Sequence, residues 1–117
     1  MAEPLHQIDP GAARARILEL LRQDGLFFPD DKRIGMMVNF GKIYGEPASE
    51  ERITDHIISL LEDSGIALRS ALQSDPPEMA WQMTDPHHLF IKLVIRERRF
   101  GEERVYAKSI HESVHPR

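Results

Sequence analysis

Residues 86–112, PHHLFIKLVIRERRFGEERVYAKSIHE, decide the fold of this 117-residue chain. Two runs rich in β-branched and aromatic residues, Leu89–Arg98 and Glu103–His111, flank the segment Arg99–Glu102, which contains Gly101. Such residues favour strands, and glycine accepts the positive φ that tight turns require. The stretch therefore predicts a long β-hairpin with glycine in its turn.

A hairpin folded symmetrically about Phe100 and Gly101 predicts which residues face one another. Three pairs form the side expected to face the core: Ile91 with Ile110, Leu93 with Lys108, and Ile95 with Tyr106. Four pairs form the other side: Phe90 with His111, Lys92 with Ser109, Val94 with Ala107, and Arg98 with Glu103. Directly opposed side chains lie about 5 Å apart, so Lys92, Ser109 and His111 are expected to form one polar cluster beside Phe90.

Two upstream stretches have the apolar period of helices. The first begins at Asp9 as N-cap, with Pro10 in the first turn, and ends at Gly25. The second spans Ser49–Asp63 and has the more regular apolar stripe. His56 lies off that stripe, which predicts an exposed surface histidine.

Three segments leave the choice of element open. Residues 29–41 contain a plausible helix start, and Gly41–Pro47 predicts a loop. Leu26–Phe28 is either a short buried strand or an apolar segment that leads the chain back to the core. Ile66–Gln73 is either a strand or an irregular helix. After a turn at Ser74–Pro77, the alternation in Glu78–Thr84 predicts a strand with Met79, Trp81 and Met83 on one face.

The order of these elements predicts an α+β fold. Two to three N-terminal helices pack on a C-terminal antiparallel sheet of three or more strands, a meander that ends in the hairpin 89–111. The length fits one domain over residues 1–117, with 1–8 and 113–117 frayed.

The charge is distributed unevenly along the chain. The net charge is −4, yet residues 88–117 carry seven basic and four acidic side chains, whereas residues 1–87 carry eight basic and fifteen acidic ones. The sequence therefore predicts a basic sheet on an acidic helical half, with an overall balance that weighs against non-specific nucleic-acid binding.

Composition also bears on location and cofactors. The chain has no cysteine, no apolar window long enough to span a membrane, and no signal-peptide pattern at its N-terminus. These features predict a cytoplasmic protein that does not enter a membrane. No His-Glu-x-x-His spacing, nucleophile elbow or phosphate-binding glycine loop is present, so we expect no metal site and no cofactor.

The polar cluster of the hairpin has the residue types for metal-free RNA cleavage. That reaction needs a base for the 2′-hydroxyl, a proton for the leaving oxygen and a cation for the phosphate. His111, Lys92 and Ser109 are the candidate catalytic residues. The candidate binding residues are the cation Arg98, the aromatic side chains Phe90 and Trp81, which can stack on bases, and Gln82.

Three short motifs resemble a family of small bacterial ribonuclease toxins. These are Trp81-Gln82, the strand Leu89–Lys92, and Ser109-Ile110-His111. They are similar to the motility quorum-sensing regulator type within the barnase–EndoU–colicin–RelE class. The resemblance implies roles in RNA contact or cleavage for Gln82, Phe90 and His111. It departs from the family pattern where His111 replaces a lysine and Phe90 replaces a tyrosine.

Three hypotheses of function follow. The first is an interaction module of antitoxin, immunity or inhibitor type, which binds another protein through its sheet or its acidic helices; a sheet edge could also join copies of the chain. The alternative is a metal-free toxin-like endoribonuclease that uses Lys92, Ser109 and His111. The third is a winged-helix nucleic-acid binder with Ser49–Asp63 as its recognition helix.

Overall fold

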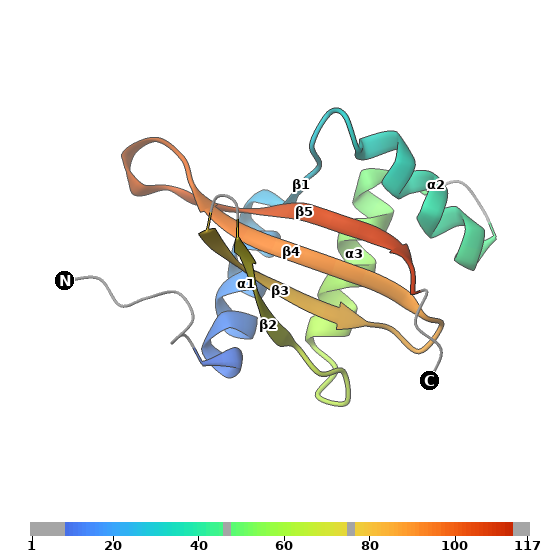
Figure 1. The fold of residues 1–117 in the computed structure, drawn as a ribbon, viewed down its shortest axis with the longest axis horizontal. Coiled ribbons are helices and arrows are strands. Elements are labelled where there is room, and N and C mark those ends of the chain that lie inside the picture. Colours follow the sequence, from blue (N-terminus) through green and yellow to red (C-terminus); the bar gives the residue numbers. More distant parts are fainter. Residues whose placement is uncertain (1–8, 46–47, 75–76, 114–117) are drawn as a thin grey trace.

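A computed structural model describes residues 9–45, 48–74 and 77–113. The expectations for 1–8, for 114–117 and for the residues at 46–47 and 75–76 lie outside this part. In chain order the elements are α1 (Pro10–Asp24), β1 (Leu26–Phe27), α2 (Arg33–Tyr44), α3 (Glu50–Leu61), β2 (Arg69–Ser74), β3 (Pro77–Thr84), β4 (Leu89–Glu97), the 3₁₀ turn η2 (Arg99–Gly101) and β5 (Glu103–Glu112). Figure 1 shows this arrangement, which confirms the α+β fold with helices first and the sheet last.

Helices α1 and α3 form where their capping residues predict. The Asp9 carboxylate accepts hydrogen bonds from the backbone N–H groups of Gly11 and Ala12, and the Ser49 hydroxyl accepts one from the N–H of Arg52. These bonds satisfy amides that have no partner inside the helix. Of the helices in the described part of the chain, none combines the length and apolar composition that a bilayer crossing requires.

Helix α2 runs further than expected. The loop predicted from Gly41 is wrong, because the helix continues to Tyr44 and ends at Gly45, whose φ of 83° is left-handed. A glycine inside a helix costs only about 1 kcal/mol. Burial of Met36 and Phe40 against the core offsets that cost.

The five described strands form one sheet in the order β1-β5-β4-β3-β2. Strands β2 to β5 make an antiparallel meander. The segment Ile66–Gln73, which the sequence left open, is a strand from Arg69 onward. Strand β1 lies parallel to β5, with Leu26 opposite Val105 and Phe27 opposite Tyr106. The sheet is thus extended by a short strand that comes from between the first two helices.

The predicted hairpin register holds for only half of its length. Opposite pairs confirm Phe90 with His111, Ile91 with Ile110 and Lys92 with Ser109. A β-bulge between Lys92 and Leu93 then shifts the pairing by one residue, so the remaining predicted pairs are wrong. The observed partners are Leu93 with Ala107, Val94 with Tyr106, Ile95 with Val105, and Glu97 with Glu103. The bulge turns Val105, Ala107 and Ile110 all toward the core, which strict alternation would not allow.

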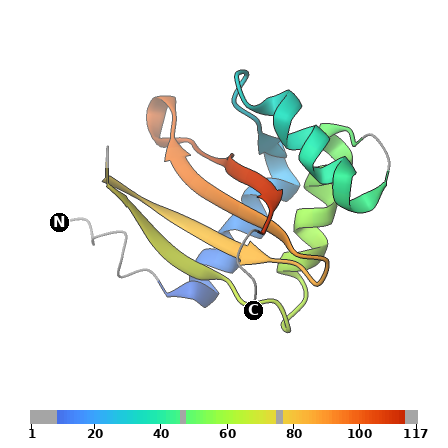
Figure 2. The same cartoon turned by 45° about the vertical axis from the view of Figure 1, so that its right-hand side comes forward.

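The helices cover one face of the sheet. Figures 1 and 2 show α1 and α3 behind the strands and α2 beside the β5 edge. The covered face and the helices share a core that includes Trp81, Leu89, Ile91 and Leu93. The opposite face carries no helix of the described chain, and we call it the open face. Its middle holds Ala80 and Val94, which are 0% exposed beneath longer neighbours.

Candidate functional site

The open face collects basic and aromatic side chains from all five strands. Strand register and alternation place on it the positions Phe27, Arg69, Ala71, Ala80, Gln82, Thr84, Phe90, Lys92, Val94, Arg96, Arg104, Tyr106, Ser109 and His111. Of these positions, Arg69, Lys92, Arg96 and Arg104 are basic; the same alternation adds one acid, Glu78, opposite Gln73 at the far end of β3. The face therefore carries more basic than acidic positions, although the chain as a whole is negative.

Aromatic rings hold the cations of this face in place. The guanidinium carbons of Arg104 and Arg98 lie 4.3 and 5.5 Å from the ring centre of Phe27, and that of Arg96 lies 5.3 Å from Tyr106. The Lys92 ammonium lies 5.9 Å from the ring centre of Phe90. Contacts within about 6 Å are attractive without neutralising the charge. For Lys92, Arg98 and Arg104, such a ring contact leaves the positive charge in place for an anion.

On the helix side, by contrast, arginines pair with carboxylates. Arg16 lies 2.8 Å from Glu103, and Arg22 forms an ion pair with Glu62. Such pairing cancels positive charge locally. Arg98 and Arg104 on the sheet are instead held by the ring of Phe27.

The predicted catalytic residues lie together on the open face. Lys92 is directly opposite Ser109, and His111 is the next open-face residue along β5. Diagonal neighbours of this kind are about 7 Å apart. The His111 ring packs on Phe90, with ring centres 5.1 Å apart.

The hydrogen bond made by His111 assigns the position of its proton. Nδ1 of His111 lies 2.9 Å from the backbone carbonyl oxygen of Glu112. A carbonyl only accepts hydrogen bonds, so Nδ1 carries the hydrogen and, in the neutral ring, Nε2 keeps its lone pair. His111 is thereby prepared to accept a proton.

The predicted binding residues divide between the two faces. Gln82 lies opposite Lys92 on the open face, and Phe90 and Arg98 make the ring contacts given above. Trp81 points the other way and is 2% exposed in the core. The expectation that Trp81 stacks on a base is therefore corrected: its indole fills space beneath the helices, as its alternation with Met79 and Met83 implies.

A buried polar network lies on the helix side. The carboxylate of Asp85, which is 3% exposed, accepts hydrogen bonds from the Tyr44 hydroxyl, from Nε2 of His56 at 2.9 Å, and from the backbone N–H groups of His87 and Leu89, each at 2.9 Å. His56 is therefore not the exposed surface residue that was predicted, since its side chain is only 15% exposed.

The network shifts two pKa values in opposite directions. Burial by itself raises the pKa of the Asp85 carboxyl, but the hydrogen bonds from His56, Tyr44 and the two amides outweigh burial and lower that pKa to about 2. Burial, followed by the hydrogen bond to Asp85, raises the pKa of Tyr44. Asp85 thus stays ionised inside the protein at neutral pH.

Only part of this site had a signal in the sequence. Asp85 precedes Pro86, and its bond to the N–H of His87 is the turn that such a pair favours. Nothing local indicates that His56 and Tyr44 also meet Asp85, or that β1 brings Phe27 to the arginines of the hairpin. Within residues 9–45, 48–74 and 77–113, no group of three or more His, Asp or Glu side chains is placed to hold a metal ion.

Comparison of the chain with protein-family models, with curated proteins and with solved structures finds no match. The chemistry of the open face and of the Asp85 network therefore stands on geometry alone.

Proposed function

We propose that the open face binds single-stranded RNA and cleaves it without a metal ion. The observation that carries the proposal is the combination of ring-stacked cations with the half-buried rings of Phe27, Phe90 and Tyr106, on a sheet face that no helix of the described chain covers. Proteins bind single strands through cations along the phosphates and rings under the bases. The open face supplies both within one surface.

A single strand fits this surface better than a duplex. The bases of a duplex are stacked on one another, so aromatic side chains reach them only in unpaired segments. The cation–ring pairs recur along the face, at Phe27 with Arg104, at Tyr106 with Arg96, and at Phe90 with Lys92. This repetition suits a chain of alternating bases and phosphates.

Cleavage uses the cluster of Lys92, Ser109 and His111. Nε2 of His111 takes the proton of a 2′-hydroxyl, and the 2′-oxygen attacks the adjacent phosphorus. The bond from phosphorus to the 5′-oxygen breaks, water gives that oxygen its proton, and a 2′,3′-cyclic phosphate remains. The Lys92 ammonium stabilises the charge that builds on the phosphate oxygens, and the Ser109 hydroxyl donates a hydrogen bond to them.

Removing two of the ring-stacked arginines tests RNA binding. The double change Arg98→Gln with Arg104→Gln, at the two arginines that stack on Phe27, is expected to weaken binding of a mixed-sequence single-stranded RNA by about tenfold or more at physiological salt. Each cation that neutralises a phosphate of a single strand adds about 0.7 to the slope of log affinity against log salt, so the double variant should have a slope smaller by about 1.4. Fluorescence anisotropy over a series of salt concentrations measures both quantities.

The matched control removes two arginines from the helix side, Arg22→Gln with Arg33→Gln, and so keeps the net charge equal to that of the test variant. Both control residues pair with carboxylates. Equal loss of affinity in the two double variants would show that total charge, and not the open face, governs binding.

A protein partner is the second candidate function, and a specific surface favours it. Helix α2 exposes Ile34 to 69% and Val38 to 52%, beside a groove of about 520 Å³ that Met37, Gly41 and Lys42 help to line. Lys42, which lines the groove, brings a positive charge to it. We propose an acidic amphipathic helix of another protein as the occupant, because its apolar stripe and its acidic flanks complement this groove.

Val38→Asp is expected to abolish binding of such a helix, since it places a carboxylate in the apolar stripe. The probe is a synthetic helical peptide with leucines at heptad spacing and glutamates on its flanks, titrated into labelled protein and followed by NMR. A peptide with lysines in place of the glutamates is the control and should bind weakly. If Val38→Asp instead turns a dimer into a monomer in sedimentation, the groove belongs to a second copy of the chain.

A further inference from the structure

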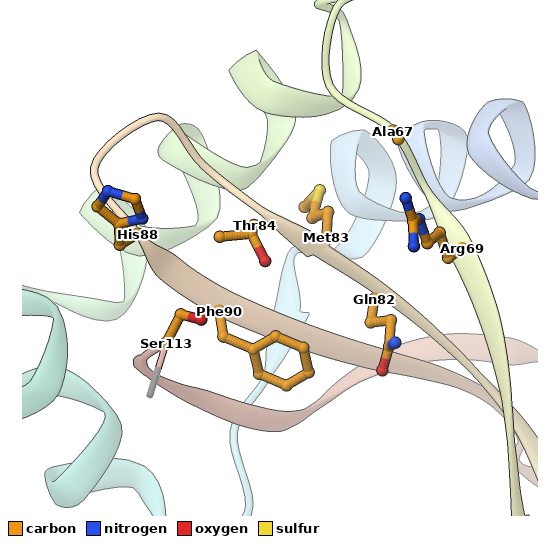
Figure 3. Close-up of a pocket in the computed structure, with 8 residues that line it drawn as sticks. All are labelled: Ala67, Arg69, Gln82, Met83, Thr84, His88, Phe90 and Ser113. Atoms are coloured by element: carbon orange, nitrogen blue, oxygen red, sulfur yellow. The ribbon is translucent and has the colours of Figure 1, made fainter. Parts of the chain in front are cut away.

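A cavity of about 470 Å³ opens at one end of the open face. Figure 3 shows it between β2, β3 and β4, with His88 and Ser113 at one end and Arg69 at the other. The remaining lining residues are Ala67, Gln82, Met83, Thr84 and Phe90. Its volume lies in the range that holds one small ligand of nucleotide size.

Each wall of the cavity has a distinct chemistry. The half-buried ring of Phe90 offers an apolar surface, and in Figure 3 the Gln82 amide lies between this ring and Arg69. The amide presents a hydrogen-bond donor beside an acceptor. Arg69 lies directly opposite Gln82 in the β2–β3 pair and brings a positive charge to the same cavity.

We infer that this cavity selects an adenine base of the bound RNA. Adenine presents an amino donor beside the N7 acceptor, which the paired groups of a glutamine amide match, whereas guanine presents two acceptors at the same edge. A purine also covers more of the Phe90 ring than a pyrimidine does. Arg69 binds the phosphate of the same nucleotide. The inference rests on the proposed RNA-binding function and adds a base preference to it.

The position of the cavity ties this preference to the proposed chemistry. Gln82 is opposite Lys92, which in turn is opposite Ser109, so three adjacent strands place the cavity beside the catalytic cluster. Phe90 is shared, because it lines the cavity and also packs on His111. A base held in the cavity therefore sets which phosphate meets Lys92.

The test measures how tightly two RNA oligonucleotides bind to the His111→Ala variant. This variant lacks the side chain that is proposed to accept the proton of the 2′-hydroxyl. One is a run of uridines, and the other has a single adenosine in its middle. We expect the adenosine to raise affinity about tenfold to a hundredfold, the usual size of one bidentate base contact. Added to this protein, Gln82→Glu keeps the size of the side chain but loses its donor; the readout is the ratio of the two affinities, which should fall to about one.

Gln23→Glu in the same protein, an exposed glutamine on α1, is the control and should keep the preference. Equal affinity of the two oligonucleotides would overturn the adenine site and leave the proposed RNA-binding function standing. Failure to bind either oligonucleotide would overturn both. Free AMP is the probe for a mononucleotide site: if it displaces RNA as effectively as the adenosine-containing oligonucleotide does, selection within RNA is refuted.

Discussion

His111→Ala is expected to lower the rate of RNA cleavage by about 10²–10⁴-fold, the usual contribution of a positioned acid or base. The variant loses the Nε2 lone pair that is free to accept a proton while Nδ1 bonds to the Glu112 carbonyl. The measurement is the cleavage of a mixed-sequence single-stranded RNA by purified protein in EDTA at neutral pH, with the products resolved by length.

Companion variants separate chemistry from folding. Lys92→Ala should also lose most of the activity, and Lys92→Arg should restore part of it, because the charge beside the phosphate returns. His87→Ala and Lys42→Ala remove the same residue types outside the open face and should keep the wild-type rate. An inactive wild type would refute cleavage while leaving RNA binding open to its own test, and full activity in His111→Ala would refute the assignment of the base.

Asp85→Ala is expected to lower the free energy of unfolding by about 3–5 kcal/mol at neutral pH. The substitution leaves the Tyr44 hydroxyl, Nε2 of His56 and the N–H groups of His87 and Leu89 without their shared acceptor. Loss of a partner to a buried donor costs about 1–3 kcal/mol each time, less where water enters. Urea unfolding curves measure the change, and Asp55→Asn, on the exposed side of α3, should change little.

The same carboxylate predicts how stability depends on pH. Its pKa in the folded protein is about 2, against 3.8 for the ordinary group. A lowered folded-state pKa stabilises the protein fully above the unfolded value, and this contribution disappears as pH falls through about 4 toward about 2. The difference corresponds to ~2 kcal/mol. Asp85→Asn should therefore flatten the acid limb of the stability curve, and an unchanged acid limb would show that other groups cause it.

The sequence predicts the hairpin but not its bulge, and the reason lies in three residues. Val105, Ala107 and Ile110 are spaced by two and then three positions, so strict alternation cannot turn them all to the core. The apolar spacing thus contains the signal for an extra residue, which the structure places at Lys108. The symmetrical register instead put Tyr106 in the core. It is wrong by one residue between the turn and the bulge, and it becomes right beyond the bulge because the extra residue restores the offset.

The cluster of Lys92, Ser109 and His111 was predictable because it depends on pairing within one hairpin. The Asp85 network and the contact of Phe27 with Arg104 were not, because they join segments far apart in the sequence. The prediction of an exposed His56 was also wrong. Its position off the apolar stripe of the helix gives no information about Asp85, the polar partner that follows strand β3. Trp81 was predicted to stack on an RNA base, although its alternation with Met79 and Met83 already indicated that it lies in the core.

The parallel pairing of β1 with β5 has a consequence for synthesis of the chain. Leu26 leaves the ribosome early and Val105 late, so a nascent chain has no partner for β1 until almost all of the sheet has been made. Contacts of such long range form slowly, after the entropy of closing the loop has been overcome. His111, Ser109 and Arg104 all belong to that last strand. An unfinished chain therefore carries neither the proposed base nor the completed cationic surface, and we expect the protein to be inert toward RNA while it is being translated.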